Sequence, residues 1–161
     1  MFSVEFMRPE VWHALSVHFP IALLPVATIT LLVSFFMGRN RRSWLTASFL
    51  LLLAGTSLAW VATYTGNIAD GIVARRICDP TVLKDHEIAA QTMTWIFTAA
   101  AVLHMTFMTD LVKGRVQTLS IYAALLLMVI GTGYLIYTGH IGATLVYDQG
   151  AGVKNHTVDC E

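Results

Sequence analysis

The chain has 161 residues, of which 56% are hydrophobic and only 12% are charged, and its formal net charge is zero. Soluble domains carry about 25% charged residues, so half that share, together with a mean hydropathy of +0.65, indicates a membrane protein. This composition excludes a disordered chain, a secreted disulfide scaffold and a soluble enzyme. Ten Lys and Arg balanced by ten Asp and Glu, without a basic stripe, exclude specific nucleic-acid binding.

Four apolar stretches run through the chain, separated by polar connections. They predict membrane spans over residues of about 12–37, 44–66, 87–110 and 117–147, in a single membrane domain of residues 1–161. Each stretch is long enough to cross a hydrocarbon core of about 30 Å as a helix, and only helices satisfy their own backbone in lipid. The expected fold class is therefore all-α, a transmembrane four-helix bundle.

Two prolines, Pro20 and Pro25, interrupt the first span. Pro20 is either the first residue of the transmembrane helix, preceded by a short interfacial helix over Pro9 to Val17, or a kink in one continuous helix. The sequence leaves both alternatives open. A cleaved signal peptide is not expected here, because the stretch is too long and follows an acidic segment.

Two short connections, over 38–42 and 110–115, together hold five cations and one acid. Short basic loops stay in the cytoplasm, which predicts that both termini lie on the outer side, the periplasm in the case of a bacterial inner membrane. The rest of the chain holds nine acids and five cations. We therefore expect an acidic outer surface that suits a basic partner.

Cys78 and Cys160 are the only cysteines, and the expected topology places both outside, in polar segments. An even pair on the oxidising side predicts a disulfide between them. Closing a loop of about 80 residues would stabilise the protein by roughly 4 kcal/mol in the chain-entropy description. Two free or metal-binding thiols are the alternative.

Four of the six histidines fall in the outer half of the predicted bundle. His18 and His140 lie about six residues inside the outer ends of the first and fourth spans, or ~9–10 Å below the surface. His13 and His86 lie at the outer ends of the first and third spans. Because ionisable groups in membrane spans are costly and usually functional, these four are candidate ligands of a cofactor or metal.

Small residues share the helix faces of these histidines, such as Ala14 and Ala22 beside His18. Histidines that face one another with small neighbours leave room for a flat macrocycle, which predicts one haem b, or two. We expect His18 and His140 as the preferred axial pair. His13 and His86 would form a second pair or bind the haem propionates. Without a Cys-x-x-Cys-His motif, a covalent c-type haem is excluded.

Two alternatives use the same histidines. A bare zinc, copper or iron ion could take three or four of them at once. A bundle without a cofactor could instead use them for hydrogen bonds between helices. The only carboxylates in the predicted spans are the terminal residues Glu87 and Asp110, and none lies within the apolar runs, so a carboxylate proton relay has no path across the membrane. No nucleotide-binding or hydrolytic motif is present, and we assign no catalytic residue.

The other two histidines have different positions. His104 lies 18 residues below His86 on the same span, ~27 Å deeper, where no other histidine reaches its level. We expect it to be structural or lipid-facing. His156 lies in the polar C-terminal tail, where we expect it to be exposed to solvent.

Two motifs resemble the family of membrane proteins called domain of unknown function 2231. They are HALSVHFPIAL at 13–23 and GHIGATLVYDQGAGV at 139–153. The family pattern opens with His-Pro-x-x-Val-His-Phe-Pro-Ile-Ala-Leu and closes with Gly-His-x-Gly-Gly-x-Leu-Val-Tyr-x-His-Gly-x-Gly-Val. It has a further His where this chain has His86. The resemblance covers nearly the whole chain, with three departures: Ala14 replaces Pro, Ala143 replaces Gly and Gln149 replaces His.

The resemblance implies a role in electron transfer, because members of the family are often fused to, or encoded beside, c-type cytochromes or Rieske-type proteins. Electrons would pass between a quinol pool or a larger respiratory enzyme and an outer-side c-type cytochrome or similar carrier. We expect such a small chain to be a subunit of a complex rather than a stand-alone enzyme, with other membrane subunits, lipid and a quinone as candidate partners. A structural anchor subunit is the alternative.

Overall fold

The computed structural model describes residues 8–109 and 112–153. Within these residues the chain forms four α-helices and no strand, with a short 3-10 helix, η2 (Gly38–Asn40), after the first of them. The α-helices are α1 (Pro9–Ser34), α2 (Arg41–Val73), α3 (Pro80–Met108) and α4 (Arg115–Tyr147). All four are long and apolar enough to cross a membrane. The predicted all-α fold with four spans is confirmed.

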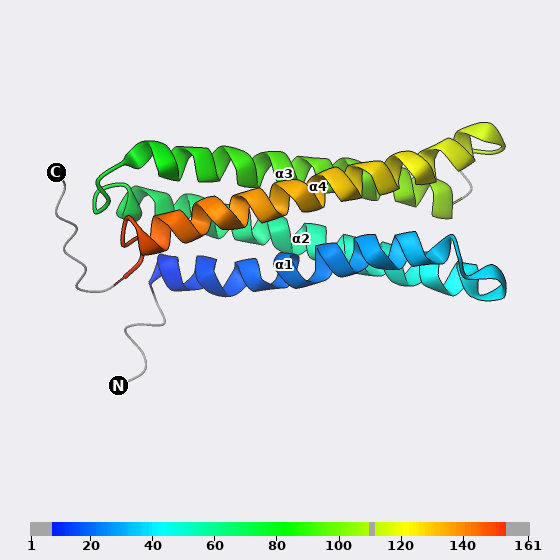
Figure 1. Ribbon diagram of the computed structural model, residues 1–161, viewed down its shortest axis with the longest axis horizontal. Coiled ribbons are helices and arrows are strands. Elements are labelled where there is room, and N and C mark those ends of the chain that lie inside the picture. The colour runs from blue at the N-terminus through cyan, green and yellow to red at the C-terminus, as the bar shows by residue number, and fades with distance from the viewer. Residues whose placement is uncertain (1–7, 110–111, 154–161) are drawn as a thin grey trace.

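The four helices lie side by side and alternate in direction (Figure 1). α1 packs most extensively on α2, and α3 on α4, so the bundle consists of two hairpins. α1 begins and α4 ends at the same end of the bundle, which we call the histidine end because His13 and His86 lie there. The opposite end carries the turns at 38–42 and 112–115, and we call it the basic end.

α2 and α3 extend beyond the predicted spans at the connection between them, whereas α1 ends at Ser34, before the predicted residue 37. α2 continues past residue 66 to Val73, and α3 already begins at Pro80. The side-chain hydroxyl and the backbone N–H of Thr81 both donate to the Asp79 carboxylate, at 2.6 and 2.9 Å, and so cap α3. These hydrogen bonds hold the pKa of Asp79 below its usual value. The length of the apolar stretches therefore underestimates the length of α2 and α3.

α1 is one continuous helix that contains both Pro20 and Pro25. A separate interfacial helix over residues 9–17 is not formed, so the continuous alternative is the correct one. Continuity fixes the relation between the two histidines of this helix, because each residue advances the helix by about 1.5 Å and 100°.

Hydroxyl groups connect α1 to α4 and to α2 in the interior. Thr28 of α1 pairs with Thr132 of α4 at 3.3 Å. The Ser48 hydroxyl of α2 donates to the carbonyl oxygen of Ala27, at 2.9 Å. Lipid is as apolar as the helix surfaces, so association of spans depends on such hydrogen bonds and on close packing of small residues.

Candidate functional site

The side chain of His13 in α1 contacts the main chain of α2. The imidazole Nδ1 lies 3.0 Å from the carbonyl oxygen of Ala62. A carbonyl can only accept, so Nδ1 carries the proton and donates it. The ring lies against Gly66, one turn further along α2, where an added Cβ would come within 3.0 Å of the His13 Cε1. The glycine thus gives the imidazole its access to the carbonyl.

His86 makes the same contact in the second hairpin. Its Nδ1 donates to the carbonyl oxygen of Thr138 on α4, at 3.1 Å. The ring lies against Gly142, again one turn beyond the carbonyl, where an added Cβ would be 3.2 Å from the His86 Cε1. In each hairpin, a histidine on the first helix therefore contacts a carbonyl and a glycine four residues apart on the second.

The two imidazoles meet between the hairpins. The ring centroids of His13 and His86 lie 6.2 Å apart, and the ring planes are inclined by 86°. Both side chains are half-buried. Because Nδ1 of each neutral ring is protonated, the lone pair lies on Nε2 in both. The pair thus offers two imidazole nitrogens of defined tautomer, the form in which histidine binds a metal.

The separation of the rings limits what they could hold. Two imidazoles on opposite sides of one metal ion, with bonds of about 2.0–2.1 Å, have ring centroids roughly 6 Å apart. Among residues 8–109 and 112–153, no group of three or more His, Cys, Asp or Glu is placed to hold a metal ion. A zinc-type site of three or four protein ligands is therefore not formed there. Haem differs, because its ring supplies four nitrogens and leaves two axial positions for histidines.

The structure places His18 and His140 differently from His13 and His86. Both side chains are exposed on the outside of the bundle. The Nδ1 of His18 donates to the Ala14 carbonyl of its own helix at 2.6 Å, a contact that does not join two helices. Of the four histidines predicted to converge, the structure brings together His13 and His86. The pairing of His18 with His140 stays a prediction.

His104 is completely buried in the bundle interior, where its ring packs on Phe49 with centroids 5.3 Å apart. Of the two expected alternatives, the lipid-facing one is wrong, because the side chain has no exposed surface. Neither ring nitrogen has a hydrogen-bond partner among the described residues. His156 lies outside the part of the chain that the structure describes.

Only one of the two cysteines of the predicted disulfide, Cys78, lies among the described residues. Cys78 lies half-buried in the connection between α2 and α3. Cys160 lies outside the described residues, so the disulfide stays a prediction.

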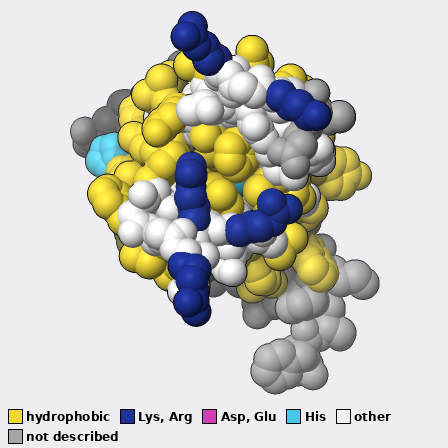
Figure 2. All heavy atoms as spheres, turned by 90° about the vertical axis from the view of Figure 1, so that its right-hand side faces the viewer, with side chains coloured by type: hydrophobic (Ala, Val, Ile, Leu, Met, Phe, Trp, Pro, Cys, Tyr) yellow, Lys and Arg dark blue, Asp and Glu magenta, His cyan; other side chains and the backbone are white. Residues whose placement is uncertain are grey.

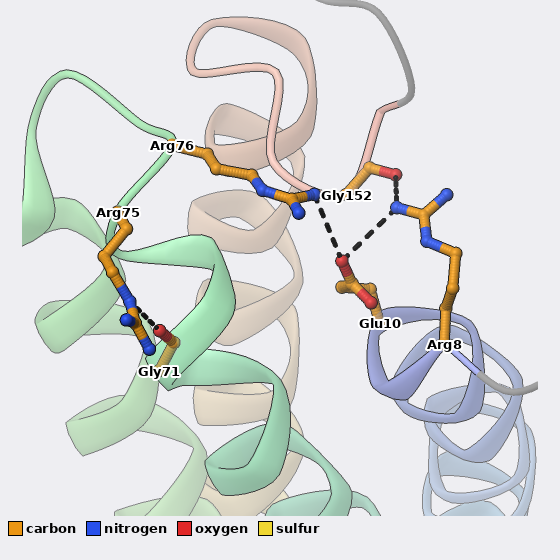
Figure 3. A network of polar contacts seen from close by, with 6 residues as sticks. All are labelled: Arg8, Glu10, Gly71, Arg75, Arg76 and Gly152. Carbon is orange, nitrogen blue, oxygen red and sulfur yellow. Dashed lines mark hydrogen bonds and ion pairs between the residues drawn. The ribbon is translucent and has the colours of Figure 1, made fainter.

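An ion-pair network covers the histidine end (Figure 3). The Glu10 carboxylate lies 3.3 Å from Arg8 and 3.7 Å from Arg76 of the α2–α3 connection. Arg8 also donates to the carbonyl of Gly152 after α4, at 3.3 Å. One turn separates Glu10 from His13 on the same face of α1. The network therefore joins three segments of the chain close to the histidine pair, and neither its members nor the two glycines were predicted.

Comparison with known protein families matches residues 10–155 to the family described as Predicted membrane protein (DUF2231). The chain belongs to this family. The resemblance inferred from the two end motifs is confirmed, and the protein is a multi-pass membrane protein. Neither the curated proteins nor the solved structures give a significant match.

The geometry gives a physical reason for parts of the DUF2231 pattern. His13 and the glycine at 142 belong to its two end motifs, and Gly142 contacts the imidazole of His86. Where the family pattern has its last His, this chain has Gln149, whose side-chain oxygen accepts a hydrogen bond from the backbone N–H of Asp79 at 3.1 Å. Gln149 therefore connects the turn after α4 to the start of α3.

Proposed function

We propose that this DUF2231 protein binds haem b and transfers electrons across the histidine end of its bundle, with His13 and His86 as the axial ligands. The observation that carries the proposal is the half-buried pair of imidazoles, 6.2 Å apart between two hairpins. Each is oriented by a main-chain carbonyl of the neighbouring helix. When bound, the group supplies one-electron redox chemistry.

The chain's own residues support such a site in two ways. The carbonyls of Ala62 and Thr138 keep the proton on Nδ1 and direct the lone pair to Nε2, which makes each imidazole a better ligand. The hairpins pack less extensively on each other than the helices within each hairpin do, so a group held between His13 and His86 would separate the surfaces that pack least.

The position of the pair suits exchange of electrons with partners on one side of a bacterial inner membrane. His13 and His86 lie within the first two turns of α1 and α3. The basic connections would keep the opposite end in the cytoplasm. Electrons would then pass between a quinol pool or a larger respiratory enzyme and an outer-side c-type cytochrome, with the chain as a subunit of that complex.

The decisive experiment is a reduced-minus-oxidised visible spectrum of the full chain, purified in detergent after expression with supplied haem. We expect a b-type α band, one haem per chain by pyridine haemochrome, and iron equal to porphyrin. A flat spectrum in folded protein would overturn the proposal. Zinc or copper without porphyrin would indicate a bare metal site instead.

A structural subunit without a cofactor is the second candidate, and one observation favours it. His13 and His86 both donate to carbonyls of neighbouring helices, so the same contacts would hold each hairpin together. This function predicts no Soret band, and it predicts that an alanine at either position lowers the stability of the bundle. The spectrum separates the two candidates.

The glycines beside the rings provide a further prediction. We expect Gly142→Ala to lower haem affinity about tenfold, because its Cβ would push the His86 ring away from the Thr138 carbonyl. Gly139→Ala on the same helix is the matched control, since a Cβ there meets no atom within 4 Å. Haem titration of the two variants, with helix content as a check, measures the difference. Equal affinities would show that Gly142 does not position His86.

A further inference from the structure

A cavity of about 370 Å³ lies at the basic end, where α2 begins, α3 ends and α4 begins. Three of its lining residues are arginines with exposed side chains, namely Arg39, Arg41 and Arg42. The lining also contains Leu45, which is buried, and Phe107, which is half-buried. The cavity is therefore charged where it meets the surroundings and apolar where it is deep.

The described residues provide no acidic partner for the arginines of the cavity. Among the described residues, no Asp or Glu pairs with Arg39, Arg41 or Arg42. Figure 2 shows this end of the bundle with Lys and Arg side chains around hydrophobic ones, and no Asp or Glu is visible among its coloured atoms. Asp110 lies outside the described residues. Three like charges around one cavity repel one another, and a bound anion would relieve that repulsion.

Backbone donors lie at the same place. Arg41 is the first residue of α2, and its own N–H already donates to the carbonyl of Gly38 in η2, so the donors in question are the N–H groups that follow it. Asn40 makes no side-chain hydrogen bond to the helix start. The first N–H groups of a helix have no partner within the helix and carry partial positive charge. Guanidinium groups together with such N–H groups are the usual ligands of phosphate oxygens.

The apolar residues near the cavity indicate whether its ligand is a free anion or a lipid. Next to the arginines, the side chains of Phe36 and Trp44 are 76% and 37% exposed. They belong to the surface that hydrocarbon would cover in a membrane. A ligand that fills the cavity and also covers this surface needs both a phosphate and acyl chains.

We infer that the cavity at the basic end binds the phosphate headgroup of an anionic phospholipid. The phosphate lies among Arg39, Arg41, Arg42 and the start of α2, and the acyl chains run along the apolar helix surface. Basic pockets between membrane helices on the cytoplasmic side suit such headgroups. This site lies at the opposite end from the histidine pair and does not depend on haem.

The test uses the full chain purified in detergent, so that an altered orientation in the membrane does not affect the result. Native mass spectrometry measures retention of phosphatidylglycerol and of phosphatidylcholine. We expect preferential retention of phosphatidylglycerol, and an approximately tenfold loss of it in the Arg41→Gln/Arg42→Gln variant. Both side chains are exposed, so the fold is retained, which helix content by circular dichroism verifies.

The matched control is Lys113→Gln/Arg115→Gln, which removes the same charge from the same end but from residues that do not line the cavity. It should retain phosphatidylglycerol to within about twofold. An equal loss in both variants would mean diffuse attraction without a site and would overturn the inference. Equal retention of the two lipids would overturn it too, as would complete displacement of phosphatidylglycerol by millimolar inorganic phosphate, which would indicate a site for free anions.

Discussion

His13→Ala and His86→Ala each lower haem occupancy at least about tenfold, because either change removes one of two axial ligands. The two single variants should lose haem to a similar extent, since each leaves one imidazole, which alone holds haem weakly. Haem per chain by pyridine haemochrome measures the effect. Helix content should remain that of the unchanged protein, because each histidine contributes one hydrogen bond between helices, worth only about 1 kcal/mol in a membrane.

His18→Ala and His140→Ala are the matched controls for this result. His18 lies on the same helix as His13, and His140 lies two residues from Thr138, which contacts His86. Each variant removes an exposed imidazole, and both variants should keep full haem occupancy. The opposite pattern, loss in these two variants and retention in His13→Ala and His86→Ala, would establish the pairing favoured by the sequence. Equal retention in all four would contradict haem ligation by any of these histidines.

Depth along the helix was predictable from the sequence, but depth alone does not bring histidines together, because side chains at one depth can point in different directions around their helices. His13 and His18 are five residues apart on one continuous helix, so their side chains point about 140° apart. They cannot both face the same partner. The same reasoning applies on α4, where His140 follows Thr138, the residue that contacts His86, by two positions and therefore points to nearly the opposite side.

The fold was predictable because it depends on length and composition. Charge-free stretches of more than 20 residues leave only helices, and four of them leave only a bundle. The helix ends were less predictable, since α2 and α3 continue beyond the apolar stretches through segments of mixed polar and apolar residues. The pair Asp79-Pro80 was the available signal for the start of α3. Contacts such as Gly66 with His13 depend on how two helices are rotated against each other, which no local pattern specifies.

Gly131→Ala destabilises the bundle by about 1–3 kcal/mol, because there is no room for a methyl group at this position. An added Cβ would lie 2.8 Å from Cε2 of Phe97, whose side chain is completely buried in the core of the bundle. An aromatic ring held on all sides cannot turn away as the end of a flexible side chain can. Unfolding of the purified protein in mixed micelles measures the change in the free energy of unfolding.

Gly133→Ala, two residues along the same helix, separates close packing from helix propensity. A Cβ at Gly133 meets no atom within 4 Å, so the change should leave the stability unaltered or raise it by up to about 1 kcal/mol. A second variant identifies the partner of the clash. Phe97→Leu makes space beside Gly131, so Gly131→Ala should cost less in its presence than alone. An undiminished cost in the double variant would show that the methyl group meets the backbone of α3 and not the ring, and that α3 and α4 cannot approach more closely at this level.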